Sequence, residues 1–436
     1  MGSGQNLYKK AKTLIPGGTM LLSKRPEMFL PENWPSYFDR AEGCHVWDLD
    51  GNVYQDMCIM GIGTNSLGYG NSKIDEAVRQ VVSKGNMSTF NCPEEVALAE
   101  RLVELHPWGD MVRFARSGGE ANSIAIRIAR AAVGKDKVAI CGYHGWHDWY
   151  LSANLAEENG LDGHLLPGLD PAGVPRNLRG SVIPFNYNNL EELKEVISNN
   201  PDLGVVKMEV SRNVGPNQGY LESVRALCDQ HNLVLIFDEC TSGFRETYGG
   251  LHKKYGVEPD MCMFGKALGN GYAITAVLGR REIMEVAQKT FISSTFWTER
   301  IGPTAGVATL EVMNEVKSWD FITEQGKKIT QRWIKLGDEL NMPLKTSGLP
   351  SLTNFYIDSP DWLKYKTYIT QEMLKKGFLA SNAVYVCTAH TDEKIDRYFD
   401  AFTSVLAEVA EFYQKGDDIG AKLEGPICHG GFKRLN

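Results

Sequence analysis

The stretch LVLIFDECTSGFRETYGGLHKKYGVEPDMCMFGKALGNG, residues 233–271, decides the fold of this chain. It opens with the apolar run Leu233 to Phe237, which is too short for a helix and is typical of a buried parallel strand. Asp238 and Glu239 follow at the carboxyl end of that run, the end at which open α/β sheets bind their ligands. A second short apolar run ends two residues before Lys266. The pattern therefore predicts an acid and a lysine at the tips of two buried strands.

An acid and a lysine in this arrangement have a definite chemistry. The lysine amine can form a Schiff base with an aldehyde cofactor, and the acid can hold a ring nitrogen protonated. A structural acid and a surface lysine are the alternative interpretation. The motif, however, resembles the signature of the class III (fold type I) pyridoxal-phosphate aminotransferases. The matching positions are Asp238, Glu239, Gly243, Phe244, Pro259, Asp260, Gly265 and Lys266.

The resemblance extends over roughly residues 10 to 415 and implies a fold. We expect a three-layer α/β/α large domain around a mostly parallel seven-stranded sheet, with a small α+β domain from the N- and C-terminal segments. The expected divisions are an N-terminal segment at 1–65, the large domain at 66–309 and the C-terminal domain at 310–436. The resemblance also implies that Lys266 holds pyridoxal phosphate as an internal aldimine, that Asp238 keeps the pyridine nitrogen protonated, and that a homodimer completes each site.

Composition restricts the class of protein. With 436 residues, 43% hydrophobic and 23% charged, the chain is long enough for two or three subdomains with a large core. The net charge of -8 argues against nucleic acid or an anionic membrane surface as a partner. Nine cysteines without CxxC spacing favour reduced thiols in a cytoplasmic protein. No run of eighteen apolar residues and no apolar leader are found, so we expect neither a membrane span nor a signal peptide.

A Gly-rich turn supplies a candidate phosphate site. A strand is predicted over 111–115 and a helix over 121–132, and Ser117, Gly118 and Gly119 lie between them. Such a turn directs backbone N–H groups to the positive end of a helix dipole. An ordinary strand-to-helix connection is the alternative. In the family the resemblance indicates, this turn holds the phosphate of the cofactor.

Two further strand ends are expected to face the cofactor. Tyr143 follows the strand predicted over 137–141 and falls where the family stacks an aromatic side chain on the pyridine ring. Glu209 ends a strand that begins at Leu203, and we expect it to form a wall of the site, with a plain strand-end carboxylate as the alternative. His144 and His147 lie three residues apart without further ligands, so no metal is predicted.

Substrate contacts are predicted from family positions. Thr295 occupies the position from which the family reaches the phosphate in the partner's site. Trp297, Glu299 and Arg300 replace the usual Gly-Asn-Pro-Leu continuation and are expected to line the pocket, with a structural salt bridge as the alternative for Arg300. Near the N-terminus, IPGGT (residues 15–19) resembles glutamate-1-semialdehyde aminomutase. Lys24, with Arg25 adjacent, falls where that enzyme anchors the substrate carboxylate with an arginine, and a solvated surface lysine and arginine are the alternative.

These expectations define a reaction. The predicted activity is a ping-pong transamination that passes through pyridoxamine phosphate, from glutamate or another amino acid to a small polar carbonyl compound. Lys266 is expected to shuttle the proton. An intramolecular 2,1-aminomutase is the first alternative, because Val214 stands where relatives with two amino donors carry a gating glutamate. A binding or scaffold protein without cofactor is the second.

Overall fold

The computed structural model describes residues 2–157, 159–164, 167–211 and 213–431. The chain divides into two compact units. One is Ser72–Trp319, and the other combines Met1–Asn71 with Asp320–Asn436. Both boundaries lie several residues C-terminal to the divisions expected from the sequence.

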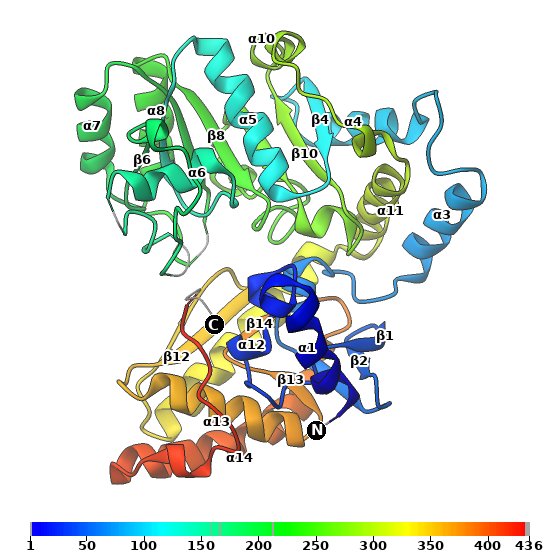
Figure 1. Ribbon diagram of the computed structural model, residues 1–436, viewed down its shortest axis with the longest axis vertical. Coiled ribbons are helices and arrows are strands. Elements are labelled where there is room, and N and C mark those ends of the chain that lie inside the picture. Colours follow the sequence, from blue (N-terminus) through cyan, green and yellow to red (C-terminus); the bar gives the residue numbers. More distant parts are fainter. Residues whose placement is uncertain (1, 158, 165–166, 212, 432–436) are drawn as a thin grey trace. The chain divides into compact units, whose positions relative to one another are not determined.

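The Ser72–Trp319 unit is built on a seven-stranded sheet in the order β4-β10-β9-β8-β7-β5-β6 (Figure 1). The strands are β4 (Met111–Ala115), β5 (Lys137–Cys141), β6 (Val182–Pro184), β7 (Leu203–Glu209), β8 (Val234–Glu239), β9 (Met261–Phe264) and β10 (Thr275–Gly279). Five of them, from β9 to β6, run parallel. β10 is antiparallel to both β4 and β9, so the sheet is mixed. The expected mostly parallel sheet is confirmed.

Strand β8 lies at the centre of this sheet, and all six of its residues are buried. A strand covered on both faces needs a continuous apolar run rather than alternation, which is what residues 233–237 supply. The strand continues through Asp238 and Glu239, which pair with Met263 and Phe264. The prediction that the strand ends at Phe237 was therefore two residues short. Pairing with a neighbour sets the end of a strand, and hydropathy does not report it.

Helices follow the strands of this unit. They are α3 (Ser72–Ser83), α4 (Pro93–Leu105), α5 (Gly118–Val133), α6 (Asp148–Leu151), α7 (Leu190–Asn199), α8 (Tyr220–Gln230), α9 (His252–Tyr255), α10 (Arg281–Met284) and α11 (Ile301–Val316). Helix α5 packs on the sheet against β4, β7, β8, β9 and β10, and Figure 1 shows it lying over the sheet between β8 and β10. Ser117 caps its start, and Gly134 ends it in the left-handed conformation that favours glycine.

The other unit contains two small sheets and three long helices. One sheet has β1 (Phe38–Glu42), β2 (His45–Asp48), β3 (Val53–Met57) and β13 (Phe378–Ala380), and the other has β11 (Leu344–Ser347), β12 (Leu352–Ile357) and β14 (Ala383–Tyr385). The helices flanking its core are α12 (Ser318–Glu339), α13 (Trp362–Lys375) and α14 (Asp392–Lys415), and α1 (Ser3–Leu14) and the short α2 (Met60–Gly63) precede them. Trp333, Phe355, Tyr398 and Phe402 pack together at its centre. β2 and β3 form an antiparallel hairpin.

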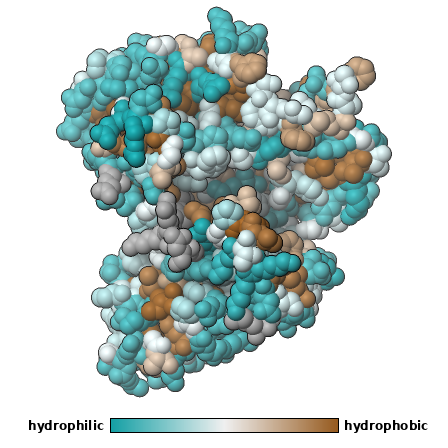
Figure 2. Space-filling view, viewed as in Figure 1, coloured by the Kyte–Doolittle hydropathy of each residue, from teal (hydrophilic) through white to brown (hydrophobic). Residues whose placement is uncertain are grey.

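The surface is mostly hydrophilic with separate apolar patches (Figure 2). Among the described residues of the Ser72–Trp319 unit, the exposed phenylalanines are Phe90, Phe291 and Phe296, with 85%, 92% and 71% of their surface accessible. Within the described part of the chain, no helix has the length and apolar character that crossing a bilayer requires. The nine cysteines are free thiols.

Candidate active site

Strand direction brings the predicted chemical groups to one edge of the seven-stranded sheet. Because β5, β7, β8 and β9 are parallel, their carboxyl ends meet there. Glu209 is paired with Asp238, and Asp238 in turn with Met263, just before Lys266. Strand β10 runs in the opposite direction, so its first residue, Thr275, lies at the same edge beside the end of β4.

Lys266 lies in a tight turn at the tip of β9. Its φ of 36° is in the left-handed region, which is strained for a residue with a side chain and recurs at functional sites. A 3-10 helix, Lys266–Gly269, begins there. The lysine Nζ donates a hydrogen bond of 2.5 Å to Thr241 Oγ1, three residues after Asp238. The Lys266 amine therefore links the turn that follows β9 to the turn that follows β8.

Asp238 is buried, with 3% of its surface accessible. Its Oδ2 accepts a hydrogen bond of 2.8 Å from His144 Nδ1, and its Oδ1 accepts one of 3.1 Å from the Cys240 N–H. Burial acts to raise the pKa of Asp238, but the nearby Lys207 ammonium and the His144 hydrogen bond outweigh burial and hold that pKa below its usual range. The carboxylate is therefore ionised at neutral pH and suited to hold a protonated ring nitrogen.

The histidine beside Asp238 is fixed by its surroundings. His144 is fully buried and packs against the rings of Trp149 and Tyr150. Burial lowers its pKa, although Asp238 opposes that effect. Among the described residues, its Nε2 has no hydrogen-bond partner. His144 is consequently a neutral imidazole whose Nδ1 proton points at the carboxylate.

Glu209 supports the turn that carries Tyr143. Its Oε2 accepts a hydrogen bond of 3.0 Å from the Tyr143 N–H. A Cβ at Gly142, where φ is 116°, would come within 2.5 Å of the same oxygen, so only glycine fits there. The Tyr143 ring meets Tyr150 edge to face. Glu209 thus determines where this aromatic side chain sits.

The predicted phosphate turn is held by a capping box. Glu120 Oε2 accepts hydrogen bonds from the Arg116 and Ser117 N–H groups, at 3.0 and 2.9 Å, and from Ser117 Oγ at 3.1 Å. The Ser117 hydroxyl oxygen in return accepts from the Glu120 N–H at 3.4 Å. Gly118 and Gly119 form the first turn of α5, where N–H groups at the positive end of the helix favour an anion.

The segment 295–300 contacts residues of this turn through a side-chain hydrogen bond and an ion pair. Trp297 Nε1 donates to Glu120 Oε1 at 3.2 Å, and Arg116 Nε lies 2.8 Å from Glu299 Oε1. Glu299 also accepts from the first N–H groups of α11, and Arg300 pairs with Glu94 at 2.5 Å. Thr295 is exposed at the start of the 3-10 helix Thr295–Thr298.

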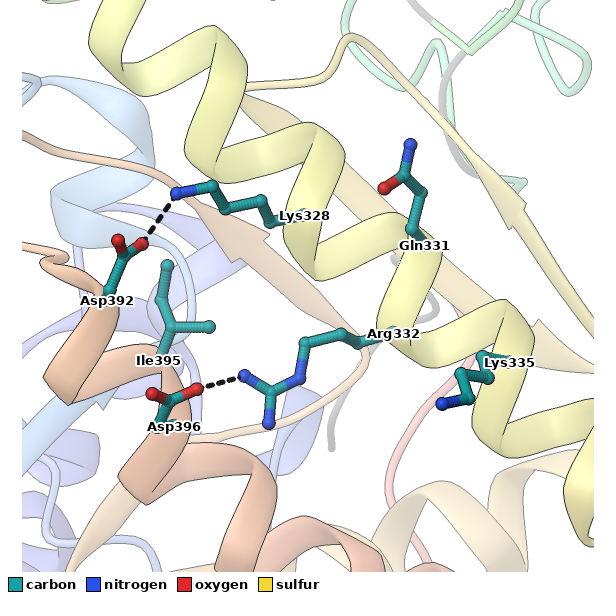
Figure 3. Close-up of a pocket in the computed structure, with 7 residues that line it drawn as sticks. All are labelled: Lys328, Gln331, Arg332, Lys335, Asp392, Ile395 and Asp396. Carbon is teal, nitrogen blue, oxygen red and sulfur yellow. Dashed lines mark hydrogen bonds and ion pairs between the residues drawn. The ribbon is translucent and has the colours of Figure 1, made fainter.

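Lys24 and Arg25 belong to the other unit. Lys24 ends the 3-10 helix Leu22–Lys24, and the Arg25 guanidinium packs over Gly17, where an added Cβ would meet Arg25 Nη2 at 2.5 Å. The same unit has a charged groove between α12 and α14 (Figure 3). Lys328 pairs with Asp392 there and Arg332 with Asp396, so these ion pairs tie the two helices together.

Behind the site lies a group of side chains with metal-ligating chemistry: Glu239, His252 and Cys262. Glu239 accepts a hydrogen bond of 2.6 Å from His252 Nδ1, and the other ring nitrogen accepts one of 3.0 Å from Trp108 Nε1. Glu239 also accepts from the His252 N–H. The histidine and the acid are thus used to hold the 248–252 segment on β8, and the group needs no ion.

Sequence reasoning did not single out Thr241, Lys207 or Arg116. Thr241 is polar at a strand end, which is common. Lys207 carried a stronger signal, because it is a charged residue inside the otherwise apolar strand 203–208. The role of Arg116 depends on a segment about 180 residues away in the chain, at 297–299, and periodicity gives no information on such pairings.

A mixed sheet with a strand-tip lysine, a buried acid and a glycine turn at one edge defines the fold type I pyridoxal-phosphate (PLP) enzymes. Within that class, the chain belongs to the class III aminotransferases, because a family model described as "Aminotransferase class-III" matches residues 31–406. It is a PLP-dependent enzyme of that family, and the residues at the sheet edge fit the group.

Named relatives agree with this membership. The chain is 34% identical to 3-aminobutyryl-CoA aminotransferase from Cloacimonas acidaminovorans, over 94% of this chain and 98% of that protein. It is 31% identical to glutamate-1-semialdehyde 2,1-aminomutase from Methanothrix thermoacetophila, over 93% and 97%. In fold it matches the PLP internal aldimine form of the FumI protein from Sphingopyxis sp. MTA144, with a TM-score of 0.86, 24% identity and coverage of 97% and 100%.

Proposed function

We propose that this enzyme transfers an amino group from an amino acid, glutamate being the first candidate, to the carbonyl carbon of a small polar acceptor in two half-reactions. The observation that carries the proposal is the joining of Lys266, Thr241 and Asp238 at one sheet edge. PLP, when bound, supplies an aldehyde carbon that receives the amino group and a ring that draws electrons from it.

In this proposal the protein side chains have separate tasks. Lys266 holds the cofactor between turnovers and, once displaced, moves the proton, with the Thr241 hydroxyl orienting its amine. Asp238, ionised and oriented by His144, binds the protonated ring nitrogen. Tyr143 covers the ring, and Ser117, Gly118 and Gly119 hold the phosphate.

We propose that two copies of the chain form the working enzyme, with Thr295 acting at the partner's phosphate. Thr295 is exposed, and so are Phe291 and Phe296 on the same segment, together with Phe90. Exposed aromatic side chains are costly in water and favour an interface. The substrate positions proposed from the sequence are Lys24, Arg25, Trp297, Glu299 and Arg300.

Adding glutamate to the PLP-loaded enzyme tests the proposed reaction. Purified enzyme loaded with PLP is mixed with glutamate, and the visible absorbance and the released oxoacid are followed. We expect the cofactor band to convert to the pyridoxamine form with about one oxoacid per chain. Lys266→Ala should abolish the conversion, whereas Lys289→Ala, an exposed lysine in the same unit, should not change it. Conversion by Lys266→Ala at the normal rate would contradict the proposal.

The second candidate is an intramolecular aminomutase, which the 31% identity with the Methanothrix enzyme supports. It makes a different prediction in the same assay. An aminomutase isomerises one amino carbonyl compound and releases no oxoacid from glutamate. Screening amino aldehydes alone, without a second substrate, distinguishes the two reactions.

A further inference from the structure

Lys207 is a buried lysine in the interior of the sheet. It lies on β7, between β5 and β8, and its side chain is fully buried. A lysine in such a place costs stability unless it is paired, because water no longer solvates its charge. Neither the phosphate turn nor the lysine turn uses it. Because burying Lys207 costs folding stability, we expect this lysine to have a functional role.

The contacts of Lys207 lead to the cofactor acid. Its Nζ lies 3.7 Å from Asp238 Oδ2 and 2.9 Å from Met263 Sδ, so its two contacts are on β8 and β9. Lys207 pairs with Ile236, two residues before Asp238 on the same face of β8, and a lysine side chain is long enough to reach this diagonal neighbour.

Charge is the main means by which Lys207 can act on Asp238. Burial lowers the pKa of Lys207 and the Asp238 carboxylate opposes that effect, so the ammonium form of Lys207 depends on this pairing. The 3.7 Å separation is longer than a hydrogen bond, and Asp238 Oδ2 already accepts one from His144. A thioether is a weak acceptor, so Met263 satisfies the ammonium poorly. The other titratable groups that influence this pair are His144, Cys240 and Cys262, and each thiol has its pKa raised, first by burial. Asp238 is thus the one partner of Lys207 among them that is ionised at neutral pH.

We propose that Lys207 is a positioning residue that shares the Asp238 carboxylate with the ring nitrogen of the cofactor. Without cofactor, the ammonium keeps the carboxylate ionised and ready to accept the ring. With cofactor bound, the same ammonium competes with the ring proton for the carboxylate and weakens the hold of the ring on that proton. The inference rests on the proposed role of Asp238.

The test is a spectral pH titration of the PLP-loaded enzyme. Lys207→Met preserves shape and removes the charge. Removing a buried positive charge near a titrating group favours proton uptake by that group, so we expect the pH midpoint of the cofactor absorbance to rise by about one unit. Arg225→Met is the matched control. It breaks the Arg225–Asp260 ion pair at the opposite end of the same sheet, and we expect it to leave the midpoint unchanged.

A second measurement uses the cofactor-free full chain. Asp238→Asn should lower the thermal midpoint of unfolding strongly when Lys207 is present, because it leaves a buried ammonium unpaired, and much less in the Lys207→Met background. If Lys207→Met does not fold alone, the double variant should fold better. Equal effects of Asp238→Asn in both backgrounds, and no better folding of the double variant, would overturn the pairing.

The two proposals can fail separately. If Asp238→Asn moves the spectral midpoint and Lys207→Met does not, Lys207 has no part in holding the ring proton and the proposed function stands. If neither variant moves it, the role of Asp238 is wrong and the inference falls with it.

Discussion

Glu120 provides the sharpest test of how the phosphate turn is held. Its carboxylate accepts four hydrogen bonds, from the Arg116 and Ser117 N–H groups, the Ser117 hydroxyl and Trp297 Nε1. Burial acts to raise the pKa of Glu120, but these donors outweigh it and lower that pKa, so the group is ionised at neutral pH. Hydrogen bonds to a charged group contribute about 1.5–3 kcal/mol each and are not additive. We expect Glu120→Ala to cost about 2–3 kcal/mol in total.

The glutamine variant separates shape from charge. An amide has one oxygen, so Glu120→Gln must turn its NH₂ either toward Trp297 Nε1–H or toward the two backbone N–H groups, and a donor then faces a donor. About half of the stabilisation should be lost, roughly 1–2 kcal/mol. For a unit of this size 1 kcal/mol corresponds to about 2–4 °C in thermal midpoint.

The assay combines thermal unfolding with titration of PLP into the cofactor-free enzyme. Without Glu120 the turn must be ordered on binding, so we expect the dissociation constant of PLP to rise by about ten- to a hundredfold in Glu120→Ala. Glu192 is the matched control. It is the equivalent residue of the α7 cap, where it accepts from the Asn186 N–H at 2.8 Å and from Asn189 Nδ2 at 3.1 Å. Glu192→Ala should lower stability similarly and leave PLP affinity unchanged. An equal loss of affinity in both variants would refute the reasoning.

Two other predictions concern pH and substrate. His106 donates through Nδ1 to the Leu102 carbonyl and accepts the Gly250 N–H at Nε2, and burial lowers its pKa to about 4. Between pH 6.5 and about 4, His106 is protonated in the unfolded chain but stays neutral in the folded chain. Up to about 3 kcal/mol of folding stability is therefore lost as the pH falls. His106→Gln should flatten thermal midpoint against pH, and an unchanged slope rejects this assignment. If Arg300 anchors an acceptor, Arg300→Ala should raise the acceptor KM about tenfold or more while Glu94→Ala does not. Equal KM values in both variants would leave Arg300 a purely structural partner of Glu94.

Most strands of the large sheet were predictable because they are short apolar runs bounded by turn residues, whereas the three-residue strand β6 was not predicted. The bounds of β4 and β5 and the end of β9 agree with those expected from the sequence. Helix α5 begins at Gly118, three residues before the predicted start, because the Ser117 cap and the Glu120 side chain stabilise a first turn that glycines disfavour. Local sequence thus predicted the element but not the interaction that starts it.

The candidate site was predictable where a motif defines it and unpredictable where distant segments meet. Lys266 and Asp238 were found at strand tips, and the glycine turn beside them could be read from its composition. The contacts of the 297–300 segment could not be predicted from the sequence, because its partners are far away in the chain. Trp297 contacts Glu120, Glu299 contacts Arg116, and Arg300 contacts Glu94. Such contacts depend on how strands pair, which one sequence does not reveal.

The pairing of β4 with β10 determines when the site can form during synthesis. Ala115, which leads into the phosphate turn, is the partner of Thr275, which follows the lysine turn. On a ribosome the chain between them takes roughly 10–30 seconds to emerge. Until then the turn after β4 has no sheet edge to join, and its apolar strand is open to chaperones and to misassembly. If this turn holds the phosphate as proposed, a chain whose synthesis stops before Gly279 lacks the assembled sheet edge to which PLP would bind.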